Sequence, residues 1–389
     1  MASTAETLLA DLIRCPSVTP ETAGAFDVLE AFLVPLGFTV TRLTFEGDGS
    51  YPVENLFATR KGAAPGPHLL FAGHTDVVPP GDAAAWSHDP FAADVADGVL
   101  WGRGATDMKS GVAAFCAALA SLANTNALEM GQISLAITND EEADAVNGTD
   151  KLMAWAKAQG HKFDFAIVGE PSSAETLGDS IKIGRRGSLS GEIVVTGTQG
   201  HVAYPEKAAN PLPVLCGAAL ALDAKWDEGT DHFQPSNLEI TSIDTGNPTS
   251  NVIPARSTLR FNIRFNDTWS AETIEAEIAR RLESVDAKGC ALSFTPRGRV
   301  SKCFLSAPVG HVALLCAIMK DELGTEPALS TGGGTSDARF ISDYCPVVEC
   351  GLVGATMHQI DERVPLGDVE RLSALYGRFI ARFLSGDQE

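Results

Sequence analysis

Short apolar segments alternate with helix-like segments along the first part of the chain. Residues 68–72, 133–137 and 165–168 are apolar at nearly every position, which is typical of strands buried on both faces. Residues 111–123 and 149–159 lie among them and have the length and composition of helices. This alternation predicts an α/β domain with a mostly parallel sheet that helices cover on both faces.

A different pattern runs through the middle of the chain. Here we predict strands over 192–195, 238–240 and 259–265, and helices over 211–224 and 271–284. The last of these strands alternates apolar and polar residues, as a half-buried strand does. We therefore expect an inserted, smaller α+β domain over residues 187–296, in which an antiparallel sheet packs against two helices.

The pattern of the first part returns near the C-terminus. Residues 309–323 predict a helix, 346–350 a buried strand and 367–385 a closing helix. We expect this part to rejoin the beginning of the chain, so that residues 1–186 and 297–389 form one domain. A chain of 389 residues also exceeds the size at which one hydrophobic core usually stops growing.

Composition and charge narrow the range of functions. With 44% hydrophobic and 20% charged residues, the chain has globular composition. Its net charge of −21 repels polyphosphate, which argues against a nucleic-acid partner, and an anionic substrate would need a local group of basic side chains. The first residues resemble an amphipathic helix rather than a signal peptide, and the most apolar stretch is too short to cross a membrane. Eight cysteines without a CxxC pair favour reduced thiols and a cytoplasmic location.

Histidine and acidic side chains follow several of the predicted strands. Because the carboxyl ends of parallel strands meet at one edge of a sheet, we expect these side chains to lie close together. Taken singly, they also have plainer explanations: polar caps of a turn, a helix N-cap, a solvated acidic loop or a structural histidine. The residues are His74, Asp76, Asp107, Glu141, Glu142, Glu170 and His358.

As a set, these side chains favour a metal site. Imidazoles and carboxylates suit Zn²⁺, and also Co²⁺ or Mn²⁺. There are enough of them for two ions that share one bridging carboxylate. The negative charges of Asp107, Glu142 and Glu170 would nearly balance two divalent ions, which explains how so many acids can lie in one place.

The motifs around these residues resemble the M20 family of dinuclear zinc amidohydrolases over nearly the whole chain. The motifs that place the chain near this family are HTDVVPPGD at 74–82, WGRGATDMK at 101–109, DEE at 140–142 and VGEPSS at 168–173. Further motifs are GRRGS at 184–188, QGHVAYP at 199–205, NVIP at 251–254 and GGGTSDARF at 332–340.

The resemblance implies two Zn²⁺ ions per subunit, with Co²⁺ as an alternative in one or both sites. The implied ligands are His74 and Glu170 for one ion, Glu142 and His358 for the other, and Asp107 for both. Glu141 would be the general base for hydrolysis of an amide bond, and Asp76 would hydrogen-bond His74. The insert is the dimerisation domain in relatives, so the resemblance implies a homodimer. His201 in the insert would stabilise the oxyanion and could reach across from a partner subunit.

A small anionic N-acyl amino acid is the implied substrate. Within the family, the motifs at 184–188 and 332–340 favour N-succinyl-L,L-2,6-diaminopimelate, which carries three carboxylates, and arginine binds carboxylates through paired hydrogen bonds. The implied substrate contacts are Arg185, Asn251, Arg264, Gly334 and Thr335. Two positions depart from the family pattern, Ser250 and Gly354, where asparagines are frequent, and both bear on substrate fit.

Other functions on the same fold stay open. One is another N-acyl amino-acid deacylase of the family, such as an acetylornithine deacetylase, or a peptidase. Another is a non-catalytic protein that binds a metal or an amino acid. The presence of Glu141 argues against the non-catalytic function, because a binding protein needs no general base.

Overall fold

The computed structural model describes residues 2–386, and the chain divides into two units. The first unit comprises the chain up to residue 183, residues 306–330 and the chain from residue 336 onward. The second unit comprises residues 184–305 and 331–335. The second unit begins three residues before the expected insert and ends nine residues after it, and the short segment 331–335, which we expected in the first domain, groups with the second unit.

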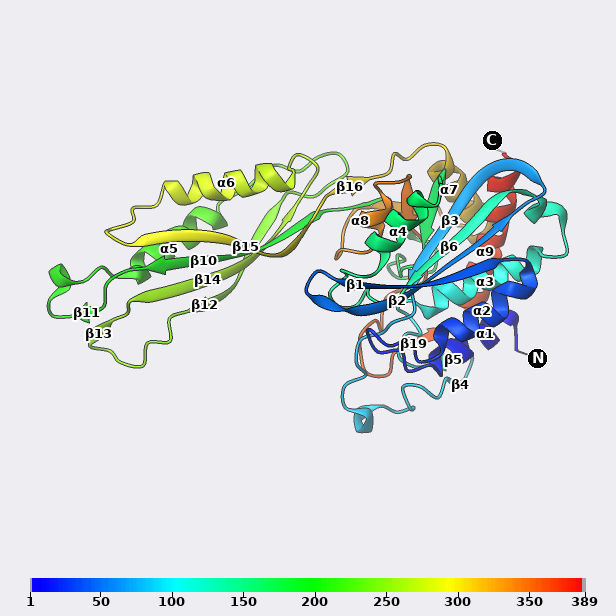
Figure 1. The fold of residues 1–389 in the computed structure, drawn as a ribbon, viewed down its shortest axis with the longest axis horizontal. Helices are drawn as coiled ribbons and strands as arrows, with labels where there is room; N and C mark the ends of the chain where they lie inside the picture. The colour runs from blue at the N-terminus through cyan, green and yellow to red at the C-terminus, as the bar shows by residue number, and fades with distance from the viewer. Residues whose placement is uncertain (1, 387–389) are drawn as a thin grey trace. The chain divides into compact units, whose positions relative to one another are not determined.

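An eight-stranded sheet forms the centre of the first unit, with the strand order β1-β2-β6-β3-β7-β18-β8-β17 (Figure 1). Neighbouring strands among β6, β3, β7 and β18 are parallel, whereas β1 with β2, β2 with β6, and β18 with β8 are antiparallel. The predicted α/β class is confirmed, and the sheet is mixed because an antiparallel hairpin precedes β3. The strands are β1 Thr39–Gly47, β2 Ser50–Lys61, β3 Ala64–His74, β6 Met130–Thr138, β7 Phe165–Val168, β8 Ser180–Lys182, β17 Ala328–Ser330 and β18 Val347–Glu349.

Helices pack against this sheet, and further short strands lie beside it. Helices α3 and α9 contact each other and β3, while α4 contacts β2 and β6. A small sheet of β4, β5 and β19 completes the unit. The helices are α1 Thr4–Ile13, α2 Ala25–Leu33, α3 Lys109–Leu122, α4 Thr149–Ala158, α7 His311–Leu323, α8 Ala338–Ile341 and α9 Leu366–Ser385, and the short strands are β4 Asp94–Ala96, β5 Val99–Trp101 and β19 Arg363–Pro365.

Aromatic contacts show that α3 and α4 lie on opposite faces of the sheet. Phe71 of β3 stacks on Phe115 of α3 at 4.2 Å between ring centroids. Phe57 of β2 lies 5.4 Å from Trp155 of α4, edge to face. Phe57 is in register, across β6, with Ala72, the residue after Phe71. Since successive side chains of a strand point to opposite faces, the two phenylalanines do so as well.

The second unit is a two-layer α+β structure, as predicted. Its antiparallel sheet has the order β12-β14-β10-β15, and helices α5 and α6 pack on one face (Figure 1). Alternate residues of β10 and β14 form its core, including Leu189, Ile193 and Phe261. The bounds are β9 Gly184–Arg185, β10 Gly187–Thr196, β11 Gly200–His201, α5 Pro211–Asp223, β12 Asn237–Asp244, β13 Val252–Ile253, β14 Arg256–Phe265, α6 Ala271–Glu283, β15 Ala291–Ser301 and β16 Phe304–Leu305. Between residues 2 and 386, no helix combines the length and apolar character needed to cross a membrane.

Candidate metal centre

Five side chains of the first unit form two overlapping groups of potential metal ligands. One group contains His74, Asp107 and Glu170, and the other contains Asp107, Glu142 and His358. Within each group, the ligand atoms lie within 4.8 Å of one another. The structure therefore brings together all five ligands named from the sequence, and it places Asp107 in both groups.

The parallel strands explain why most of these residues meet. His74 is the last residue of β3, Glu142 follows β6, and Glu170 follows β7. These three strands are neighbours and run in the same direction, so the segments that follow them leave the sheet at one edge. Asp107 lies two residues before the start of α3, and His358 lies in the long connection after β18.

The two carboxylate oxygens of Asp107 face different histidines. Asp107 Oδ1 lies 3.3 Å from His74 Nε2, and Oδ2 lies 3.3 Å from His358 Nε2. His74 Nε2 is also 3.5 Å from Glu170, and His358 Nε2 is 3.0 Å from Glu142. This arrangement is the one that a carboxylate bridging two cations requires.

Two buried atoms of this centre make no hydrogen bond, which fits a metal-binding site. His74 Nε2 and Asp107 Oδ1 are both buried and make no hydrogen bond to the described residues. Buried polar atoms are nearly always paired, so two such atoms facing each other indicate a ligand between them. Imidazole nitrogens and carboxylate oxygens are the donors that Zn²⁺ and Co²⁺ accept, so the residues present fit a pair of divalent ions.

The acids and histidines shift one another's pKa. Although burial opposes it, contact with Asp107 and Glu170 holds the pKa of His74 well above its usual range. Contacts with Asp107 and Glu142 raise the pKa of His358 to about 10. Burial and the charge of Asp107 raise the pKa of Glu170 to about 8. The carboxylates therefore favour positive charge at this place.

Asp76 makes different contacts from those expected. The His74 ring nitrogen Nδ1 lies 2.9 Å from the main-chain carbonyl oxygen of Asp76, whereas its nearest carboxylate oxygen is 3.6 Å away. The carboxylate instead accepts the main-chain N–H of Glu142 at 3.1 Å and of Glu141 at 3.4 Å, and the hydroxyl of Thr19 at 2.8 Å. Asp76 therefore orients His74 through its backbone and holds the Glu141–Glu142 segment through its side chain.

The acidic run after β6 divides into structural residues and site residues. Asp140 is fully buried, and its Oδ2 accepts the N–H groups of Val146 and Asn147 at 2.8 Å each. Its Oδ1 accepts the hydroxyl of Tyr51 at 2.8 Å. Asp140 thereby closes the loop that carries Glu141 and Glu142, so this loop is not simply a solvated acidic segment.

We expect Tyr51→Phe to loosen this loop. The variant loses the hydroxyl that Asp140 accepts, which should lower the free energy of unfolding by about 1 kcal/mol. It should also weaken binding of the ion that Glu142 would hold. Denaturant unfolding and metal titration measure the two effects. Tyr344→Phe is the matched control, because the Tyr344 hydroxyl makes no hydrogen bond to the described residues; equal behaviour of the two variants would contradict the role of Tyr51.

Gly111 in the first turn of α3 allows a close approach that helps to build the centre. A Cβ atom at this position would lie 2.2 Å from the carbonyl oxygen of Gly169, well inside van der Waals contact. Only glycine therefore lets the helix that follows Asp107 lie against the segment that carries Glu170. The helix itself begins at Lys109, and no side chain caps it, so Asp107 is not its N-cap.

Glu141 belongs to neither ligand group but lies close to the centre. Burial raises the pKa of its carboxyl well above its usual range, and the charge of Glu170 adds to the effect. Such a carboxyl near a metal centre has the properties of a proton acceptor and donor.

The other predicted site residues lie in the second unit, in separate places. Arg185 of β9 is buried and donates to the carbonyl oxygen of Gly332 at 2.8 Å, beside Gly334 and Thr335 in the segment 331–335. The strand β11 with His201 pairs with β13, next to Asn251, at the end of the unit away from β16 (Figure 1). Arg264 lies on β14, opposite Ser188 of β10. The structure therefore groups Arg185 with Gly334 and Thr335, and His201 with Asn251.

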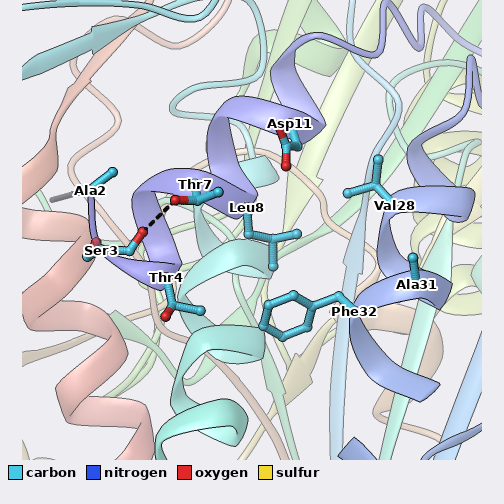
Figure 2. A pocket seen from close by; sticks show the side chains of 9 residues that line it. All are labelled: Ala2, Ser3, Thr4, Thr7, Leu8, Asp11, Val28, Ala31 and Phe32. Carbon is cyan, nitrogen blue, oxygen red and sulfur yellow. Dashed lines mark hydrogen bonds between the residues drawn. The ribbon is translucent and has the colours of Figure 1, made fainter. Parts of the chain in front are cut away.

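A cavity of about 510 Å³ lies between α1 and α2, apart from these residues (Figure 2). Its lining is mostly small or apolar, including Leu8, Val28 and Phe32, with Asp11 as its one carboxylate. None of the predicted site residues lines this cavity.

Sequence reasoning missed one residue beside the metal centre. Glu362 is fully buried and contacts the segment that carries Asp107. Neither periodicity nor spacing singles it out, because its partners come from segments more than 250 residues away.

The fold and the metal centre together define a class of protein, and comparison with known families gives the same answer. Residues 70–382 match the model of Peptidase family M20/M25/M40, and the chain belongs to this family. Two relatives over nearly the full length are named succinyl-diaminopimelate desuccinylase. The one from Methylorubrum populi is 54% identical and covers 96% of this chain and 97% of its own. The one from Rhodopseudomonas palustris is 51% identical and covers 99% of both chains.

Solved structures share the fold at low sequence identity. An M20 family metallo-carboxypeptidase from Sulfolobus solfataricus matches with a TM-score of 0.77 and 17% identity, over 99% of this chain and 100% of its own. A dinuclear metal-binding peptidase of the M20 family from Bacillus subtilis matches with a TM-score of 0.70 and 15% identity, over 98% and 97%. These similarities confirm the fold class.

Proposed function

We propose that this chain hydrolyses the amide bond of N-succinyl-L,L-2,6-diaminopimelate, giving succinate and L,L-2,6-diaminopimelate. The observation that carries the proposal is identity of 51–54% over nearly the whole chain to relatives named for this reaction. The two ligand groups around Asp107 support it, because they fit the two-metal chemistry of an amidohydrolase.

The proposed cofactors are two divalent ions per subunit, zinc in the first place and cobalt as the alternative. His74 and Glu170 would hold one ion, Glu142 and His358 the other, and Asp107 both. When bound, two such ions polarise the amide carbonyl and acidify a water molecule.

Glu141 is the proposed general base. It takes the proton of the attacking water and returns it to the nitrogen of the leaving amine. Its partly buried position and its raised pKa support this role, because a carboxyl that holds its proton more firmly than usual can donate it again after accepting it.

Substrate carboxylates need cationic partners in a protein with a net charge of −21. We propose Arg185 and Arg264 for this purpose, with Gly334, Thr335 and Asn251 as further contacts. The contact of Arg185 with the segment 331–335 supports part of this set, since it places a guanidinium beside the main chain of that segment.

A homodimer through the second unit belongs to the same proposal, with His201 reaching the oxyanion from the partner subunit. In this unit Leu220 of α5 and Ile243 of β12 are large apolar side chains that are mostly exposed. We also propose a cytoplasmic location, because all eight cysteines lie among the described residues and are free thiols.

The test is succinate release by zinc-loaded protein from N-succinyl-L,L-2,6-diaminopimelate, beside acetate release from N-acetylornithine. We expect rapid hydrolysis of the succinyl compound alone, abolished by a chelator and restored by zinc. Hydrolysis of the acetyl compound instead would preserve the metal centre and overturn the assigned substrate. Binding of two ions without hydrolysis of either compound would overturn the proposed reaction.

A further inference from the structure

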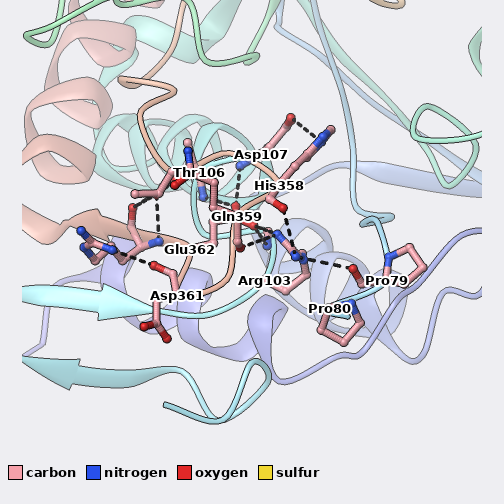
Figure 3. Close-up of polar contacts among 12 residues, drawn as sticks. Pro79, Pro80, Arg103, Thr106, Asp107, His358, Gln359, Asp361 and Glu362 are labelled. Atoms are coloured by element: carbon pink, nitrogen blue, oxygen red, sulfur yellow. Dashed lines mark hydrogen bonds and ion pairs between the residues drawn. The ribbon is translucent and has the colours of Figure 1, made fainter. Parts of the chain in front are cut away.

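Arg103 and Glu362 form a buried ion pair beneath the metal centre (Figure 3). Arg103 Nη1 lies 2.7 Å from Glu362 Oε2, and the two residues are 3% and 0% exposed. Neither residue is a potential metal ligand. Their contacts with the ligand-bearing segments suggest what the pair does.

Glu362 holds the segment that carries Asp107. Its Oε1 accepts the main-chain N–H of Thr106 at 2.8 Å and of Asp107 itself at 3.1 Å. Its Oε2 accepts the N–H of Gly104 at 3.1 Å in addition to the guanidinium of Arg103. Four donors thus fix one carboxylate, and one of these donors is the backbone of the ligand common to both groups.

Arg103 holds the segment that carries His358. Its Nη1 donates to the carbonyl oxygen of Gln359 at 3.2 Å, and its Nη2 lies 3.5 Å from the carbonyl oxygens of His358 and Pro79. Pro79 belongs to the segment after His74. The guanidinium therefore joins the chain after one histidine ligand to the chain around the other.

The ligands on these two segments depend on such support. Asp107 and His358 both lie outside helices and strands, and His358 has a φ of 62°, in the left-handed region that few residues other than glycine adopt. A buried ion pair contributes little net stability compared with an apolar pair of the same size. The ion pair instead fixes positions, because it joins the segment that carries Asp107 to the segment that carries His358. The side chains of these two residues lie 3.3 Å apart.

We propose that Arg103 and Glu362 are positioning residues that set the distance between Asp107 and His358 for binding of the second metal ion. The inference rests on the proposed metal centre. Removing the pair should weaken the ion held by Asp107, Glu142 and His358 more than the ion held by His74 and Glu170. Replacing a residue that hydrogen-bonds a metal-ligand segment typically lowers metal affinity by about 10–100-fold, and we expect a loss of that size here.

The test compares two conservative variants with a matched control. Arg103→Lys keeps the charge but loses the planar fork, and Glu362→Gln keeps the shape but loses the charge. Arg281→Lys is the control, because Arg281 of α6 also pairs with a glutamate, Glu277 at 2.8 Å, and donates to three carbonyl oxygens, but it lies in the second unit. Each metal-free protein is titrated with Co²⁺ by calorimetry, and the visible spectrum of the bound Co²⁺ reports its ligand geometry.

We expect Arg103→Lys and Glu362→Gln to weaken one of two binding events by about 10–100-fold, to weaken the other less, and to change the Co²⁺ spectrum. Arg281→Lys should leave both unchanged. Wild-type affinity and spectrum in a folded Arg103→Lys or Glu362→Gln protein would overturn the proposal, and so would an equal loss in Arg281→Lys. If Glu362→Gln does not fold, Arg103→Lys decides by the same readouts. Failure of the wild-type chain to bind two ions would instead overturn the metal centre itself.

Discussion

Glu141→Gln is expected to lower the rate of succinate release by about 10²–10⁴-fold while both metal ions stay bound. Glutamine keeps the size of the side chain but cannot take a proton from water. Metal content should not change, because Glu141 belongs to neither ligand group. The measurement is the turnover rate together with the number of ions per chain in the same preparation.

Glu142→Gln is the control for this variant. The two residues are adjacent, but the Glu142 carboxylate contacts His358 at 3.0 Å within a ligand group. Substitution of Glu142 should therefore weaken metal binding, whereas substitution of Glu141 should not. Near-normal turnover of Glu141→Gln would refute the assignment of the base, and loss of an ion from that variant would show that Glu141 is a ligand.

Asp107→Ala is expected to weaken the binding of both ions, whereas His358→Ala should weaken only one. The reason is geometric: the two oxygens of Asp107 face His74 and His358 separately, while His358 contacts one group alone. Loss of a direct ligand should weaken metal binding by more than the roughly 10–100-fold that is typical when a residue supporting a ligand is replaced. Titration of the metal-free proteins with Zn²⁺ gives the number and affinity of the sites.

The comparison of these two variants separates a shared ligand from an ordinary one. Two intact binding events in Asp107→Ala would show that Asp107 does not bridge. Loss of both events in His358→Ala would show that the two ions depend on one another more strongly than the shared carboxylate alone explains. Thr356→Ala, beside His358 but in neither ligand group, serves as a control for general damage to this loop.

The pattern of apolar and polar residues was sufficient to predict many of the strands and helices. The apolar runs at 68–72, 133–137 and 165–168 lie within β3, β6 and β7, and the helix predicted over 271–284 is α6 within one residue. The prediction lacks the β1–β2 hairpin. Many residues of β1 are only partly buried, so its apolar pattern is weak, and pairing with β2 stabilises it instead.

The candidate metal ligands could also be predicted from residue type and position in the sequence. Histidines and carboxylates directly after parallel strands must lie near one edge of the sheet, since adjacent strands hold their ends in register. This holds for His74, Glu142 and Glu170. The hydrogen bonds of Asp140 could not be predicted in this way, because its partner Tyr51 lies on a strand 89 residues away in the sequence.

Residue pattern alone therefore specifies the α/β class, the inserted α+β unit and the kinds of ligand at the strand ends. These properties depend on periodicity and on the chemistry of single side chains, which are local. Tertiary structure decides which atoms face one another. It turns the Asp76 carboxylate to the backbone of the Glu141–Glu142 segment, and it pairs Arg103 with Glu362 across 259 residues of chain. Such contacts depend on the path of the backbone between distant segments, and no spacing along the chain encodes that path.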